Sequence, residues 1–174
     1  GYDVTPQITA LKNGEIDLIS QISQEVPQAC KGDSRFEITP VETSVTGVLR
    51  MRTDLAPWND NRVRQALKAC QHREKILALT IQNEGILGHD FHVSPKQPSY
   101  CPKPVPKYDP EKSRALLKAA GYPDGLSVTL NFHSGTKHNV RLAEILKEDC
   151  RAGGFNVTLN PTPEYWDKWT EYDL

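Results

Sequence analysis

The sequence predicts an α/β fold in which a mixed sheet contains a strand–helix–strand parallel crossover. Three stretches carry this prediction. Apolar and polar residues alternate over residues 126–132, an apolar stripe at helical spacing follows over 140–150, and alternation returns over 155–159. Because the connections between these stretches are short, we expect the two strands to lie parallel and the crossover to be right-handed.

Shorter elements are expected before this crossover. The predicted order is a helix over 6–11, a strand over 16–19, a loop or short helix over 26–34, and two strands over 36–41 and 45–51. Asn13-Gly14 is a stop signal for the first helix. The last two strands have a short connection, so we expect them to pair antiparallel.

Residues 55–76, LAPWNDNRVRQALKACQHREKI, predict one capped helix followed by a second. After the break at Pro57, Asn59 or Asp60 can cap the first helix. Its apolar stripe has the spacing i, i+3, i+4, i+7 and consists of Val63, Ala66, Leu67 and Cys70. We interpret the nearby charges as structural, with Asp60 capping and the arginines Arg62 and Arg64 pairing with it or bridging backbone carbonyls.

The second helix is expected to begin at Gln71 or His72 and to end at Gly85 and Gly88. A proline-rich irregular segment follows over 89–107. Asp109-Pro110-Glu111 then predicts another helix start, and Gly121 its end. Near the end of the chain, a short aromatic helix is expected to contain Tyr165, Trp166 and Trp169. We expect the two tryptophans to pack in the core or between lobes rather than to form a platform on which a ligand stacks. Residues 172–174 resemble the middle of a further strand.

Composition excludes several classes of protein. The net charge of −1 argues against a nucleic-acid partner held by bulk charge, and no apolar run is long enough to span a bilayer. The first nine residues, GYDVTPQIT, lack the basic and apolar stretches of a signal peptide, so we expect a mature terminus or an internal start.

The four cysteines lack the C-x-x-C spacing of structural zinc sites. Cys70 and Cys150 lie on helical stripes and are expected to pack as small hydrophobic residues. Cys30 and Cys101 lie in loops, where an oxidising compartment would permit a disulfide, and the sequence does not choose among the pairings.

Four stretches occur in an order and spacing that we recognise. They are ALKNGEID (10–17), PWNDNRVRQAL with HREKI (57–67 and 72–76), YDPEKSRALLKAAGYPDG (108–125) and GGFNV (153–157). Together they resemble the family-5 extracellular solute-binding proteins, the peptide- and nickel-type receptors of ABC importers. Arg52 departs from the pattern, because many members have asparagine there.

The resemblance implies a lobe like those of periplasmic binding proteins, in a periplasmic or extracytoplasmic receptor. Members are two to three times longer, so we expect this chain to be a middle segment. Residues 1–44 would form an edge of the first lobe with hinge-proximal strands, and 45–174 a C-terminally truncated second lobe. The implied partners are a peptide or similar small solute and the membrane permease, with no cofactor. We expect the segment alone to bind peptides weakly or not at all.

Five residues are candidates for ligand contact. Arg50 and Arg52 share one side of a predicted strand and could hold a carboxylate or a phosphate. His133 follows a strand and His138 begins a helix, the place where α/β folds bind ligands. The resemblance adds that a histidine near this helix start faces the peptide in relatives. His92 lies in the proline-rich loop, with His89 and Asp90 close by in the sequence.

Two other functions compete with peptide binding. A nickel- or metal-chelate-binding member of the same family is possible, although no second cluster of ligands completes a metal site around His89 and His92. A small hydrolase using Ser134 with His133 or His138 would lack an oriented third group, and no G-x-S-x-G, H-E-x-x-H or P-loop motif is present. The sequence therefore favours a binding protein over an enzyme.

Overall fold

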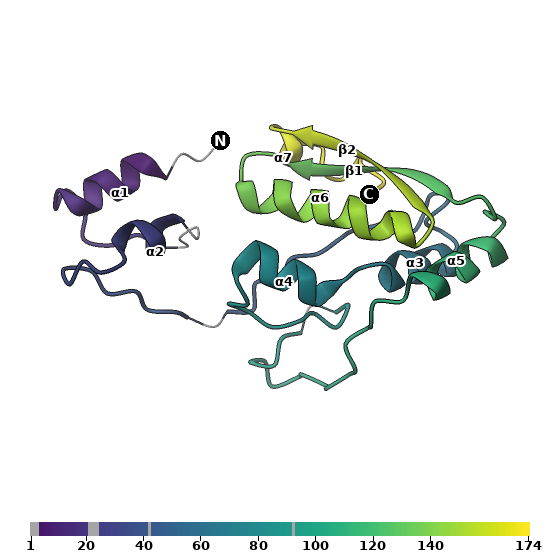
Figure 1. The fold of residues 1–174 in the computed structure, drawn as a ribbon, viewed down its shortest axis with the longest axis horizontal. Coiled ribbons are helices and arrows are strands. Elements are labelled where there is room, and N and C mark those ends of the chain that lie inside the picture. Colours follow the sequence, from purple (N-terminus) through teal and green to yellow (C-terminus); the bar gives the residue numbers. More distant parts are fainter. Residues whose placement is uncertain (1–3, 21–24, 42, 92) are drawn as a thin grey trace. The chain divides into compact units, whose positions relative to one another are not determined.

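The computed structural model describes residues 4–20, 25–41, 43–91 and 93–174. The chain divides into two compact units, Gly1–Glu42 and Thr43–Leu174. Figure 1 shows the order of the helices and strands along the chain. The assignment of residues 1–44 to an edge of the first lobe stays a prediction.

The first unit contains two helices, α1 (Thr5–Lys12) and α2 (Glu25–Cys30). Helix α1 confirms the helix predicted over 6–11, and α2 shows that the segment predicted as a loop or short helix contains a short helix. The strand predicted over residues 16–19 is wrong, because the backbone there forms no strand and Leu18 is 76% exposed. Alternating apolar residues form a strand only where a neighbouring strand satisfies the backbone and a core covers one face.

Three helices of the second unit begin at side-chain caps. They are α3 (Asn61–Ala69), α4 (Arg73–Ile81) and α5 (Pro110–Ala119). Their caps are Asp60, His72 and Asp109, which accept hydrogen bonds from the backbone N–H groups of Arg62, Lys75 and Lys112 at 2.7, 3.2 and 2.9 Å. These caps confirm the predicted helix starts. The predicted end of α4 at Gly85 is wrong, because Gln82 takes the left-handed conformation with φ of 55°.

The predicted parallel crossover is confirmed. Strands β1 (Leu126–His133) and β2 (Phe155–Thr162) pair in parallel, with Leu126 opposite Phe155 and His133 opposite Thr162. Helix α6 (Lys137–Ala152) connects them, and the short helix α7 (Tyr165–Lys168) follows β2. Figure 1 shows α6 running beside the two strands. The fold is therefore α/β.

Two glycines allow the sheet to start. Gly125 and Gly154 have φ of 98° and 93°, which side chains rarely adopt. A Cβ atom on Gly125 would lie 2.6 Å from the Gly154 carbonyl oxygen. That oxygen accepts a hydrogen bond from the Leu126 N–H at 2.9 Å, so the close approach is the beginning of the β1–β2 pair.

The end of the chain lies against β1. The Asn131 N–H donates to the Leu174 carbonyl at 2.9 Å, and the Arg52 N–H donates to the Asp173 carbonyl at 3.0 Å. Residues 172–174 thus connect β1 with the segment before Pro57. Despite these hydrogen bonds, residues 172–174 form no strand, so the strand predicted there is wrong.

The antiparallel strand pair predicted over 36–41 and 45–51 is wrong. Described residues in both ranges form no strand, and Val41 and Val45 are 74% and 87% exposed. The alternation in these stretches marks a face that could be buried, but no neighbouring backbone among the described residues pairs with it as a regular ladder.

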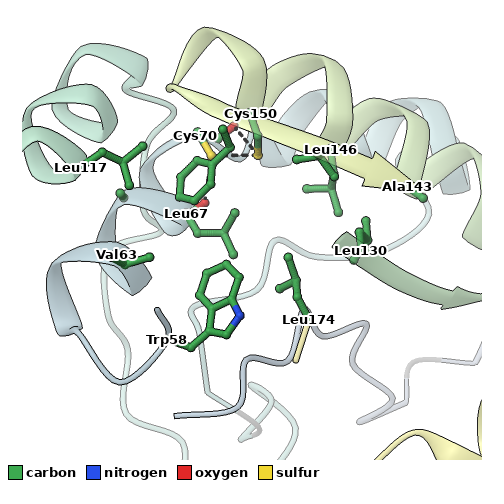
Figure 2. Packing of buried hydrophobic residues seen from close by; sticks show 13 residues of the cluster. Trp58, Val63, Leu67, Cys70, Leu117, Leu130, Ala143, Leu146, Cys150 and Leu174 are labelled. Carbon is green, nitrogen blue, oxygen red and sulfur yellow. Dashed lines mark hydrogen bonds between the residues drawn. The ribbon is translucent and has the colours of Figure 1, made fainter. Parts of the chain in front are cut away.

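One buried cluster holds the second unit together (Figure 2). Helix α3 supplies Val63, Ala66 and Leu67, which are at most 1% exposed, and Trp58 just before the helix is equally buried. The cluster continues onto α5, α6 and both strands through Leu117, Leu130, Ala143, Leu146, Phe155 and Val157. The apolar stripe read from the sequence is therefore the part of α3 that packs against the other layers.

Charged residues fix the corner before α3, as predicted. The Arg62 guanidinium pairs with the Asp60 carboxylate at 2.6 Å and donates to the Ala119 carbonyl at 2.5 Å. The Arg64 guanidinium donates to the Trp58 carbonyl at 2.6 Å. The bond from Arg62 to Ala119 connects the start of α3 with the end of α5, so these charged residues have a structural role.

Substitution of Val63 should destabilise the second unit. Val63→Ala removes two buried methyl groups and should lower the free energy of unfolding by about 2 kcal/mol. Val45→Ala is the matched control, since Val45 is 87% exposed, and should change little. Urea unfolding followed by circular dichroism measures both. Equal losses in the two variants would contradict the assigned core.

Asp60 should contribute stability that depends on pH. The hydrogen bond from Arg62 lowers the pKa of Asp60 below its ordinary 3.8. Because the folded pKa lies below the unfolded one, the contribution is present above about pH 4 and is lost as pH falls through the folded pKa. Asp60→Ala should therefore lower the urea midpoint at pH 7 more than Asp60→Asn, which keeps a capping oxygen, and the gap between wild type and Asp60→Asn should shrink toward pH 2. A gap that stays constant with pH would refute the assignment.

Candidate functional site

The candidate site lies at the carboxyl end of β1, where open α/β sheets bind ligands. His133 is the last residue of β1, and α6 begins four residues later with Thr136 as its cap. The Asn139 side-chain amide donates to the His133 carbonyl at 3.1 Å. This bond joins the strand end to the first turn of α6, whose free amides favour a negatively charged group.

A row of aromatic rings borders this strand end. The His133 ring lies 6.3 Å from the Trp166 ring, between centroids. Trp166 meets Tyr165 edge-on at 5.2 Å, and Tyr165 stacks on Tyr172 at 5.5 Å. Trp166 is 65% exposed and Trp169 42%. Trp166 lies on α7 and Trp169 directly follows that helix, and with these exposed fractions neither is a core residue of the second unit. The choice between lobe packing and a stacking platform stays a prediction.

Arg50 holds the segment that follows α7. Its guanidinium carbon lies 5.0 Å from the centroid of the Trp169 ring, a cation–π distance. The same guanidinium donates to the carbonyls of Trp169 and Tyr172, the latter at 3.0 Å. The Arg50 guanidinium therefore binds backbone carbonyls and an aromatic ring of its own chain.

Arg52 binds the same segment from the next position on that side. Its guanidinium pairs with Asp54 at 2.5 Å and donates to the Thr170 carbonyl at 3.4 Å. The hydrogen bond from Arg52 lowers the pKa of the Asp54 carboxyl below its ordinary value. Arg50 and Arg52 therefore both support residues 169–173, although the segment that carries them forms no strand.

The remaining predicted residues are placed differently. His138 is exposed in the first turn of α6. His92 lies outside the described residues, and its neighbour Asp90 pairs with Arg73 at 2.7 Å and with Lys68 at 3.6 Å. The structure thus places His133 and the two arginines around one aromatic segment, and His138 at the adjacent helix start.

A groove that sequence reasoning missed lies on the polar face of the strands. It has a volume of about 420 Å³, and its lining residues are Pro57, Trp58, Ser127, Val128, Thr129, Asn131, Thr158, Glu171, Tyr172 and Asp173. The Asn160 amide donates to the Asn131 side-chain oxygen at 2.7 Å across the strands. The groove offers hydroxyl, amide and carboxylate groups to a polar molecule. Its signal in the sequence is the run of Ser, Thr and Asn at alternate strand positions.

Among the residues that the structure describes, no group of three or more His, Cys, Asp or Glu side chains could hold a metal ion. Within the same ranges, no helix combines the length and apolar character needed to cross a membrane.

Comparison with known proteins identifies the sequence pattern. The family model of the bacterial extracellular solute-binding proteins, family 5, middle part, matches residues 2–174. The glutathione-binding protein GsiB of Salmonella choleraesuis is 28% identical over 129 residues, which cover 74% of this chain and 25% of the relative. Heme-binding protein A of Haemophilus influenzae is 26% identical over 169 residues, covering 94% of this chain and 30% of the relative. The chain thus spans a quarter to a third of these relatives.

Solved structures share the fold. NikZ from Campylobacter jejuni, in complex with Ni(L-His), matches with a TM-score of 0.79 at 24% identity, covering 99% of this chain and 37% of that chain. The oligopeptide-binding protein AppA from Bacillus subtilis, in complex with a nonapeptide, matches with a TM-score of 0.69 at 20% identity, covering 98% and 38%. These likenesses confirm the fold expected of a lobe in a periplasmic binding protein.

Loss of the Arg50 side chain should loosen the aromatic segment. Arg50→Gln removes the guanidinium bonds to the Trp169 and Tyr172 carbonyls, and amide hydrogen exchange in residues 170–174 should become about tenfold faster. Arg141→Gln, on the exposed side of α6, is the control and should leave this exchange unchanged. Unchanged exchange in Arg50→Gln would show that Arg50 does not hold the segment.

Proposed function

The chain belongs to the bacterial extracellular solute-binding proteins of family 5, and from this premise we propose that the protein captures a peptide outside the cytoplasm and delivers it to the permease of an ABC importer. The observation that carries the proposal is the family match, which extends over residues 2–174. The proposed role is binding rather than catalysis.

Peptide is proposed over other solutes because of what the relatives are said to bind. GsiB is named for glutathione, a tripeptide, and the AppA structure holds a nonapeptide. Heme-binding protein A and NikZ carry other ligands. A peptide main chain needs hydrogen-bond donors and acceptors at regular spacing together with partners for its charged termini. Hydroxyl and amide groups at the polar face of β1 and β2 fit the first need.

The proposed mechanism is closure of two lobes on the ligand. Binding energy stabilises the closed form, which the permease then recognises. Residues 45–174 would contribute the second lobe, with its ligand-facing edge at the carboxyl end of β1. No covalent step is required, so the residues need only orient the ligand and exclude water.

The candidate contacts have different roles within this proposal. His138 is exposed beside the free amides of the α6 N-terminus, so it is assigned to a carboxylate of the peptide. His133 is half-buried against Trp166 and is assigned to the same end of the ligand. Arg50 and Arg52 are engaged with backbone carbonyls and are assigned to positioning residues 169–173. His92 stays a prediction.

Ligand binding by the full-length protein tests the proposal. Isothermal titration calorimetry with glutathione, dipeptides, an oligopeptide mixture, haem and a nickel–histidine complex should give micromolar or tighter binding for at least one peptide. His138→Ala should weaken that binding about tenfold, the loss expected for one charge-assisted hydrogen bond. Arg141→Ala is the control and should bind as the wild type does.

Three results would change the conclusion. Binding of haem or nickel–histidine alone would replace the peptide by another solute. Recovery of a cleaved peptide would indicate a hydrolase. Unweakened peptide binding in His138→Ala would remove His138 from the site.

A further inference from the structure

Two cysteine side chains meet in the core of the second unit. Cys70 caps the end of α3, and Cys150 lies near the end of α6. They are 0% and 1% exposed, and the Cys70 thiol donates to the Cys150 sulfur with the sulfur atoms 2.8 Å apart. Figure 2 shows both side chains pointing toward each other from their helices. The sequence had placed them on two separate apolar stripes.

The backbone around the two thiols is tightly packed. A Cβ atom on Gly153 would lie 2.5 Å from the Cβ of Cys70, so α3 and the end of α6 approach as closely as a glycine allows. The Ser113 hydroxyl, also fully buried, donates to the Gly153 carbonyl at 2.8 Å. Three helix segments are thus packed closely at this junction. The two sulfur atoms therefore cannot separate without disturbing the packing of these segments.

We propose that Cys70 and Cys150 form a disulfide bond in the mature protein, which links α3 to α6 through the core. The reaction is thiol–disulfide exchange with a disulfide-bearing oxidant, such as glutathione disulfide or an oxidised thiol oxidoreductase. One thiolate attacks the oxidant to give a mixed disulfide, and the second thiolate displaces the oxidant's remaining sulfur. Two protein thiols become one disulfide, and the oxidant is reduced to two thiols that take up the two protons.

The surroundings of the pair favour bond formation during folding. The hydrogen bond with Cys70, burial, and the negative charge of Asp149 all raise the pKa of the Cys150 thiol in the folded chain. Since the thiolate is the reactive form, exchange is fast before the core closes and slow afterwards. A bond formed during folding is then shielded from reductants.

The other described cysteines serve as internal controls. Cys101 is exposed, and Cys30 is buried in the other unit. Among the described residues, Cys70 and Cys150 are the cysteines whose sulfur atoms contact each other. Both side chains belong to the buried apolar cluster, as expected of small hydrophobic residues, and the proposal adds a bond between them.

Peptide mapping tests the bond directly. The full-length protein is refolded in a glutathione redox buffer, its free thiols are blocked with N-ethylmaleimide under denaturing conditions, and it is digested with trypsin without reductant. Cleavage after Lys68 and Arg73 gives ACQHR, and cleavage after Lys147 and Arg151 gives EDCR. Mass spectrometry should find the two joined, two hydrogen atoms lighter than their sum. Recovery of both peptides carrying N-ethylmaleimide would overturn the proposal.

Thermal unfolding provides a second, independent measurement. Wild-type protein that is unfolded in denaturant, reduced with dithiothreitol and refolded in its presence should have a Tm about 5–15 °C below that of the oxidised protein, because the unfolded chain loses its cross-link. The Cys101→Ala variant should show the same shift and still yield the linked peptide. In Cys70→Ala/Cys150→Ala, dithiothreitol should leave Tm unchanged. A Tm shift in that double variant as large as in the wild type would assign the effect to another bond and contradict the proposal. Neither measurement uses the ligand, so failure of the proposed peptide binding would leave this test unaffected.

Discussion

Burial of one face of α3 is the interaction on which the second unit depends. Val63, Ala66 and Leu67 fill the space between α5, α6 and the two strands, and Trp58 extends the contact in front of the helix. Removal of this apolar area from water is the main favourable term that can offset the entropy of ordering the chain. The polar contacts of Arg62 and Arg64 set the direction in which α3 enters that core, because each connects the helix start to a backbone carbonyl.

The same packing decides where a ligand could be held. With α6 fixed against α3 and the sheet, the carboxyl end of β1 and the N-terminus of α6 lie at one edge, joined by the Asn139 bond to His133. Residues 169–174 complete this edge, held by two arginines on one side and by β1 on the other. Rigid elements therefore present the candidate contacts, which suits the proposed closure on a ligand.

The features that were predicted correctly are those encoded within a few residues. Asp60, His72 and Asp109 cap helices through bonds that span two or three positions, so their effect is visible in the sequence. The strands expected over 36–41 and 45–51 failed because a strand needs a partner backbone that local alternation does not specify. In the site, alternation named Arg50 and Arg52 as candidates. It did not predict their binding to carbonyls about 120 positions away or the groove beside them.

By itself, the sequence determined the helix starts, the apolar stripes, the parallel crossover and the family pattern. Each of these depends on spacing along the chain or on the order of short motifs. Only the tertiary structure decided that Cys70 meets Cys150, that Arg50 lies over Trp169, and that the polar face of the strands forms a groove. These contacts join elements far apart in the chain. Which residues meet depends on how the helices pack against the sheet, and a local sequence pattern does not specify that packing.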